Sequence, residues 1–86
     1  MSVLEVAVVG GGNGSYTMAG DFALAGHRVR MWPGATEKHA HLFREGMIRL
    51  ERMGRTGVAR LELVSDNLGE VVREAAVVVC TDPAHT

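Results

Sequence analysis

Cysteine and long apolar runs are scarce in this sequence of 86 residues. Cys80 is the only cysteine, so no disulfide bond can form within the chain, and this fits a reducing, cytoplasmic setting. No apolar run approaches the ~20 residues that a membrane-spanning helix needs. The amino terminus also lacks the basic region of a signal peptide. We therefore expect a cytoplasmic protein rather than a secreted, disulfide-stabilised or membrane-embedded one.

An excess of charge of either sign is also absent. The chain carries 9 Lys+Arg against 10 Asp+Glu, a formal net charge of −1, and its basic residues are scattered between Arg28 and Arg73. This distribution argues against a nucleic acid or a membrane surface as a partner. The hydrophobic share of 47% is too high for a disordered tail, so the sequence predicts one small globular domain at most.

The beginning of the chain has the pattern of a strand, a helix and a second strand. Residues 3–9 form a nearly unbroken apolar run, which is typical of a strand covered on both faces in a parallel sheet. The glycine-rich residues 10–14 end this run, and a helical pattern continues over residues 15–25. Three residues of that helix fall on one apolar stripe: Met18, Phe22 and Ala25. Residues 29–32 predict a second strand, which completes a β–α–β unit of the usual size.

The rest of the chain continues to alternate between helical and extended patterns. A second helix is expected over residues 35–46. Segments 48–51 and 58–64 alternate between apolar and polar residues, and they predict either a hairpin or a loop leading into a third strand. A short helix, capped at residues 65–67, then leads to the apolar run 75–80, which predicts another parallel core strand.

This succession of elements indicates an α/β fold with a Rossmann-type parallel sheet, in the form of a βαβαβ half with a hairpin insertion. The last predicted strand is followed by no helix that could cover it. We therefore expect residues 1–86 to be an incomplete domain, the N-terminal part of a larger two-domain protein; the alternative is that something else completes the sheet.

The run Gly10-Gly11-Gly12-Asn13-Gly14-Ser15 has the spacing of the dinucleotide-binding motif G-x-G-x-x-G/A, between a predicted strand and a predicted helix. Gly10 permits the tight turn, and Gly12 lets the backbone approach a pyrophosphate. The third position, Ser15, must be small so that helix and strand can pack. Backbone N–H groups and the positive end of the helix dipole then face the diphosphate. The alternative is a glycine-rich surface turn without a ligand.

Recognition of the cofactor's ribose is expected after the second strand. There Trp32-Pro33-Gly34 stand in place of the acid that binds the 2′-hydroxyl of NAD. Without that acid, Thr36, Lys38 and the start of the second helix could bind the 2′-phosphate of NADP, which favours NADP. The alternative is that Glu37 or main-chain groups serve NAD. Trp32 is expected either to flank the adenine or to plug the end of the strand.

Asp82 and Pro83 follow the last predicted strand, at the end of the sheet where a cofactor cleft lies. The candidate cofactor-binding residues are therefore Gly10, Gly11, Gly12, Asn13, Gly14, Ser15, Trp32, Pro33, Thr36, Asp82 and Pro83. No metal site is expected, because no zinc-ligand spacing occurs. On a helix, His39 and His41 would point roughly 200° apart, which favours structural or solvated roles for both.

The glycine run and the segments after it resemble the amino terminus of the opine dehydrogenases, a family that includes octopine and nopaline dehydrogenases. The matching segments, in the expected order, are residues 6–15, 18–19, 23–29, 46–48, 64–68 and 83–84. Two positions depart from the family pattern: Pro33 stands where the family has an acid, and Ser15 replaces a glycine.

The resemblance implies an NAD(P)H-dependent dehydrogenase that condenses a 2-oxo acid with the amino group of an amino acid and reduces the imine by hydride transfer. It also implies that the catalytic histidine and its carboxylate partner lie in a second, largely helical domain. No catalytic residue is therefore assigned in this chain, which by itself is expected to be inactive.

Other functions remain as alternatives. Glycerol-3-phosphate dehydrogenase and ketopantoate reductase share the glycine-rich turn and the Gly-His-x-Val element found at residues 26–29, although Asn13-Gly14 favours the opine side. A non-catalytic module that senses a dinucleotide is another possibility. The third is a remnant that binds nothing and either folds poorly or forms a dimer through its uncovered last strand.

Overall fold

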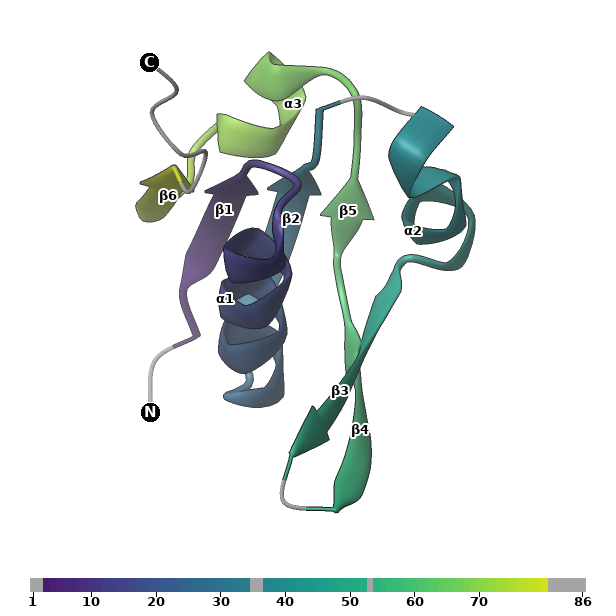
Figure 1. Ribbon diagram of the computed structural model, residues 1–86. Helices are drawn as coiled ribbons and strands as arrows, with labels where there is room; N and C mark the ends of the chain where they lie inside the picture. Colours follow the sequence, from purple (N-terminus) through teal and green to yellow (C-terminus); the bar gives the residue numbers. More distant parts are fainter. Residues whose placement is uncertain (1–2, 35–36, 53, 81–86) are drawn as a thin grey trace.

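Four parallel strands form the main sheet of the protein in a computed structural model that describes residues 3–34, 37–52 and 54–80 (Figure 1). The elements follow in the order β1 (Glu5–Val9), α1 (Asn13–Leu24), β2 (Arg28–Trp32), the 3-10 helix η1 (Glu37–His39), α2 (Ala40–Glu45), β3 (Met47–Arg52), β4 (Arg55–Arg60), β5 (Leu63–Val64), α3 (Leu68–Val72) and β6 (Val77–Cys80). The strand order is β5-β2-β1-β6, and every neighbouring pair is parallel. The predicted α/β class and parallel sheet are therefore confirmed.

β1 lies inside the sheet, with β2 on one side and β6 on the other. The side chains of Val6, Ala7 and Val8 are all 0% exposed. A strand buried on both faces needs no polar alternation, which explains the continuous apolar run in its sequence.

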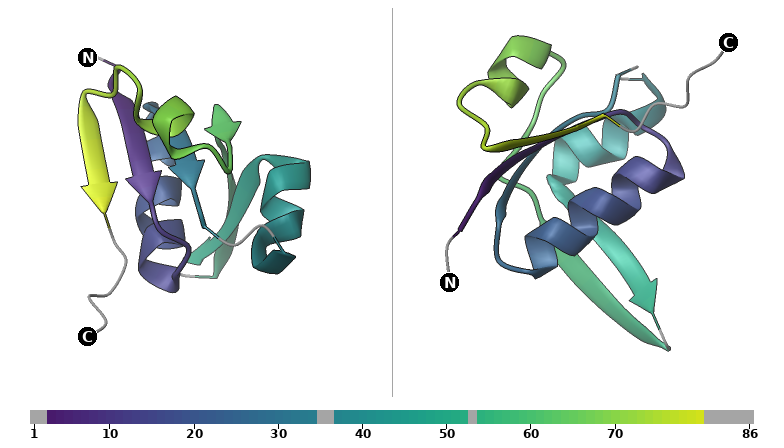
Figure 2. Two further views of the ribbon diagram at one scale, coloured as in Figure 1. Left: turned by 90° about the horizontal axis from the view of Figure 1, so that it is seen from above. Right: turned by 90° about the vertical axis from the view of Figure 1, so that its left-hand side faces the viewer.

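The two faces of the sheet are covered by different helices, as the edge-on view shows (Figure 2). α1 packs on the face that holds the main core, and α3 packs against β1 and β2 on the opposite face. The buried side chains of the core are Val6, Val8, Ala19, Val29, Met31, Leu42, Ile48 and Ala59. The expected cap of α3 is present, because Asn67 Oδ1 accepts a hydrogen bond of 3.1 Å from the Glu70 N–H.

β3 and β4 form an antiparallel hairpin outside the main sheet (Figure 1). The hairpin packs along α1, where a Cβ built on Gly20 would overlap Leu50. After the hairpin the chain joins the main sheet as the short strand β5. The hairpin and the third strand, which the sequence left as alternatives, therefore both occur in succession.

The second predicted helix begins as the 3-10 turn η1 and continues as α2. It ends at Gly46, whose φ of 65° places it in the left-handed region that favours glycine at the end of a helix. α1, with 12 residues, is longer than α2 or α3. Within the described ranges, no helix is long and apolar enough to cross a membrane.

One expectation about buried faces is wrong. Met18, placed on the core stripe of α1 from its spacing, is 36% exposed, whereas Ser15 and Ala19 are 1% and 0% exposed. The fully buried positions of α1 hold small residues, whereas the larger side chains of Tyr16 and Phe22 are partly buried against the core. The run 75–80 forms the expected parallel strand, β6, which pairs with β1 at a sheet edge and leaves Val78 49% exposed, as expected of a strand without a covering helix.

Candidate functional site

The glycine-rich loop joins the carboxyl end of β1 to the start of α1. Gly10 has a φ of 133°, which a residue with a side chain rarely adopts, so the turn requires glycine at this position. Its N–H donates a hydrogen bond of 2.8 Å to the carbonyl of Trp32. The loop is therefore attached to the end of β2, the neighbouring strand in the sheet.

Gly11 is packed against the segment that follows β2. A Cβ built on this residue would overlap the carbonyl oxygen of Pro33 and lie 2.5 Å from His39 Nε2. Pro33 itself is buried. Position 11 is therefore glycine for a structural reason, since the inner side of the loop has no room for a side chain.

Gly12 has the opposite environment. It caps the amino end of α1 with φ −85° and ψ 178°, and a Cβ built on it would meet none of the described residues within 4 Å apart from its chain neighbours. The same is true of Gly14, one residue into the helix. Gly12, as the N-cap residue, supplies no side chain to cap α1, and the first turn contains no acidic residue. The start of the helix, with the positive end of its dipole, therefore faces open space over the outer side of the loop.

The first turn of α1 also shows why its third motif position is small. Asn13 is the first helical residue, and Tyr16 N–H closes the turn by donating to the Gly12 carbonyl at 3.1 Å. Ser15 is buried on the side of the helix that packs into the fold. A small residue at this position lets the start of the helix lie close to the sheet, the packing that the motif requires.

His39, for which the sequence favours a structural or solvated role, lies beside the loop. Tyr16 Oη and His39 Nδ1 are 2.6 Å apart, which links α1 to η1. Burial lowers the pKa of His39 below its ordinary value of 6.5, and the charges of His41 and Lys38 lower it further. Burial also raises the pKa of Tyr16 above 10.0. The hydrogen bond therefore joins a neutral phenol and an imidazole that is difficult to protonate.

The expectation that His39 and His41 point away from each other is wrong. Their ring centres lie 5.7 Å and 6.4 Å from that of Tyr16, so both rings flank one tyrosine. The α-helical angle does not apply, because His39 ends a 3-10 turn and α2 begins at Ala40. His39 and Tyr16 are 23 positions apart, and no local pattern in the sequence predicts their contact.

Trp32 connects the end of β2 to the segment between β5 and α3. Its Nε1 donates a hydrogen bond of 3.0 Å to the Asp66 carbonyl, which links the end of β2 to the segment before α3. Next to this contact lies a groove of about 650 Å³, lined by Ala40, Phe43, Arg44, Val64, Ser65 and Asp66. Three of the candidate positions, Thr36, Asp82 and Pro83, lie outside the described residues.

The structure thus brings Gly10–Ser15, Trp32 and Pro33 together at the carboxyl end of β1 and β2. The backbone N–H groups at the start of α1, where Gly12 has no side chain to block access, can bind an anion. No cluster of His, Cys, Asp or Glu suited to a metal ion occurs in the part of the chain that the structure describes.

Comparison with known proteins indicates a distant relationship to the opine dehydrogenases. The chain is 32% identical over 78 residues to a curated opine dehydrogenase from Arthrobacter sp. (strain 1C). The match covers 91% of this chain but 22% of the relative, so the chain spans about a fifth of that protein's length. No family model matches the sequence, and no solved structure gives a significant match.

Proposed function

We propose that this chain is the dinucleotide-binding, N-terminal part of an opine-dehydrogenase-like oxidoreductase. The observation that carries the proposal is the space over Gly12 at the start of α1, which is free of the other described residues. The distant opine dehydrogenase relative supports the same function. In this proposal, a further domain of the parent enzyme supplies the catalytic residues and binds the 2-oxo acid and the amino acid.

The residues of the loop fit the diphosphate of NAD or NADP. Gly10 turns the chain, and Gly12 leaves room for the diphosphate because it has no side chain. Backbone N–H groups in the first turn of α1 donate to the phosphate oxygens, and the helix dipole favours their charge. When bound in its reduced form, as NADH or NADPH, the cofactor would supply the hydride that reduces an imine.

The proposal extends to the choice between the two cofactors. Pro33 stands at the end of β2, where an acid would repel a 2′-phosphate. Lys38 follows shortly after and is exposed, so it can reach a phosphate group from η1. We therefore propose that the chain binds NADPH more tightly than NADH.

The experiment is a separate titration of the purified chain with NADPH and with NADH. Binding is followed by quenching of Trp32, the only tryptophan, and by calorimetry. Wild type should bind saturably, and Gly12→Val should weaken binding at least about tenfold, the loss of a major contact. The fold should survive this change, because a Cβ at position 12 meets no neighbour.

Gly57→Val is the matched control, because it makes the same substitution on the hairpin, away from the loop. A Cβ there would lie 4.0 Å from Leu24 Cδ1, an ordinary contact. This variant should bind like wild type. A folded wild-type chain that binds neither nucleotide, or a Gly12→Val variant that binds as well as wild type, would show that the loop is not the cofactor site.

A further inference from the structure

A second hollow lies at the amino end of the sheet, where β1 and β2 begin. Its volume is about 390 Å³, and its lining is formed by Glu5, Arg28, Arg30, Arg73 and Glu74. The Ala76 N–H donates a hydrogen bond of 2.8 Å to the Glu5 carbonyl, which holds the segment after α3 beside the start of β1. The glycine-rich loop is at the other end of the same strands, so the two places do not overlap.

The alternation of β2 directs its arginines to this side. Val29 and Met31 are both 0% exposed and belong to the core under α1. Since successive side chains of a strand point to opposite faces, Arg28 and Arg30 lie on the face that α3 partly covers. The two arginines therefore share one face with the residues that follow α3.

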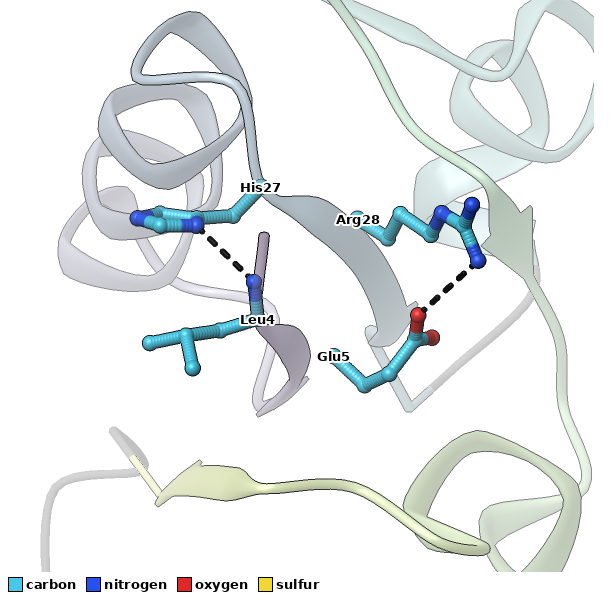
Figure 3. A network of polar contacts seen from close by, with 4 residues as sticks. All are labelled: Leu4, Glu5, His27 and Arg28. Carbon is cyan, nitrogen blue, oxygen red and sulfur yellow. Dashed lines mark hydrogen bonds and ion pairs between the residues drawn. The ribbon is translucent and has the colours of Figure 1, made fainter. Parts of the chain in front are cut away.

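The two carboxylates of the hollow already have arginine partners. Arg28 Nη1 lies 3.2 Å from Glu5 Oε2, across the β1–β2 pair (Figure 3). Arg73 Nε lies 3.8 Å from Glu74 Oε2. Three arginines against two glutamates leave Arg30 as the excess positive charge.

The guanidinium of Arg30 has two buried nitrogen atoms, Nε and Nη2, for which no hydrogen-bond acceptor is present among the described residues. Arginine remains charged in proteins, and a buried charge is ordinarily paired. Nε and Nη2 donate from the same edge of the guanidinium group. That edge matches the two oxygens of one carboxylate, or two oxygens of a phosphate, in a bidentate pair.

We propose that this hollow is a binding site for a small oxyanion, a carboxylate or a phosphate, held by the bidentate edge of Arg30. Arg28 and Arg73 add positive charge around it. The side chains of Arg73 and Glu74 are 79% and 86% exposed, so the hollow opens to solvent on their side. Because the Nε and Nη2 atoms are screened from solvent, the side chains around the hollow shift when the anion enters. The site does not depend on nucleotide binding.

The test is an NMR titration of the chain with inorganic phosphate and, separately, with acetate, each against sodium chloride at the same ionic strength. The ¹⁵N spectrum reports the Nε–H of Arg30 and the backbone amides of residues 73–76. At least one of the two anions should shift these signals saturably, whereas chloride should not. No saturable shift with either anion, or an equal shift with chloride, overturns the proposal.

Variants then assign the site to Arg30. Arg30→Lys keeps the charge but removes the bidentate edge, and it should weaken binding at least about tenfold. Arg49→Lys is the matched control, since Arg49 is 65% exposed and pairs with Glu45 elsewhere in the fold. Equal binding by Arg30→Lys and wild type contradicts the assignment.

Two more variants separate the site from folding effects and from the glycine-rich loop. Arg73→Ala changes an exposed side chain, so it should leave the fold intact and weaken binding several-fold. If Arg30→Lys does not fold, Arg73→Ala provides the test, and anion binding equal to that of wild type then refutes the site. Gly12→Val should leave the shifts at residues 73–76 unchanged, whereas their loss would place the anion at the loop.

Discussion

Alanine at position 11 should destabilise the protein, whereas alanine at position 12 should have almost no effect on its stability. Gly11 has no positive φ, so the cost of the first change comes from overlap alone. The new Cβ would overlap the Pro33 carbonyl oxygen, a backbone atom that cannot turn aside, and would press on His39 Nε2 at 2.5 Å. At Gly12 the corresponding space is open.

The expected magnitudes follow from these surroundings. Over-packing costs about 1–3 kcal/mol, and restricting the unfolded chain offsets about 0.4–1 kcal/mol of it. The net loss for Gly11→Ala is then about 1–2 kcal/mol, and for a domain of this size each kcal/mol lowers Tm by about 4–8 °C. At position 12 alanine restricts the unfolded chain to the same extent, which stabilises the fold. This gain is nearly cancelled by a loss of about 1 kcal/mol, because alanine is less favourable than glycine at the N-cap of a helix.

The assay is urea and thermal unfolding of both variants and wild type, followed by circular dichroism under identical conditions. A double variant, Gly11→Ala with His39→Ala, should recover part of the loss, since one of the two overlapped groups is then removed. The reasoning is refuted if Gly11→Ala is as stable as wild type. It is also refuted if Gly12→Ala loses as much stability as Gly11→Ala.

Two further predictions concern other parts of the fold. The pKa of His39 lies below 6.5, so the unfolded chain binds more protons than the native one near and below that pH. Stability should therefore fall as the pH is lowered through this range, and Tm against pH should be flatter for His39→Gln than for wild type; equal slopes contradict it. We also expect the chain to form homodimers at high concentration through the open edge of β6, where Val78 is 49% exposed. Val78→Lys should prevent this, and a wild-type chain that sediments as a monomer at high concentration rules it out.

The parts of the fold that the sequence predicts are those with a local cause. β1 is a continuous apolar run because it is buried on both faces, and the run itself reports this burial. Gly46 ends α2 because the chain there enters the left-handed region, and Asn67 begins α3 because its side chain satisfies a free backbone N–H. Each of these signals lies within a few residues of the structure that it predicts.

The parts that the sequence does not predict depend on contacts between distant segments. The choice of Ser15 and Ala19 over Met18 as the buried face of α1 depends on which side of the helix meets the sheet and the hairpin. The Tyr16–His39 hydrogen bond spans 23 positions, and helical geometry assumed across residues 39–41 gave the wrong direction for the histidine rings. The candidate site shows the same difference. Its glycine loop follows a local sequence motif, whereas no local motif predicts that His39 packs beside that loop.

Because the strands are parallel, their carboxyl ends and their amino ends lie at opposite edges of the sheet, and each edge can attract an anion in a different way. At the carboxyl ends, Gly12 and the start of α1 offer backbone N–H groups and a helix dipole, which contributes only about 0.3–1 kcal/mol toward a charge at the surface. A ligand at that end must therefore gain most of its affinity from other contacts, as the adenosine of a dinucleotide can. At the amino ends, Arg30 offers a full charge and two aligned donors, which suit a small ion that has nothing else to contribute. We therefore expect inorganic phosphate to bind more tightly at Arg30 than at the glycine-rich loop. The anion site and the dinucleotide site can thus be tested, and refuted, independently.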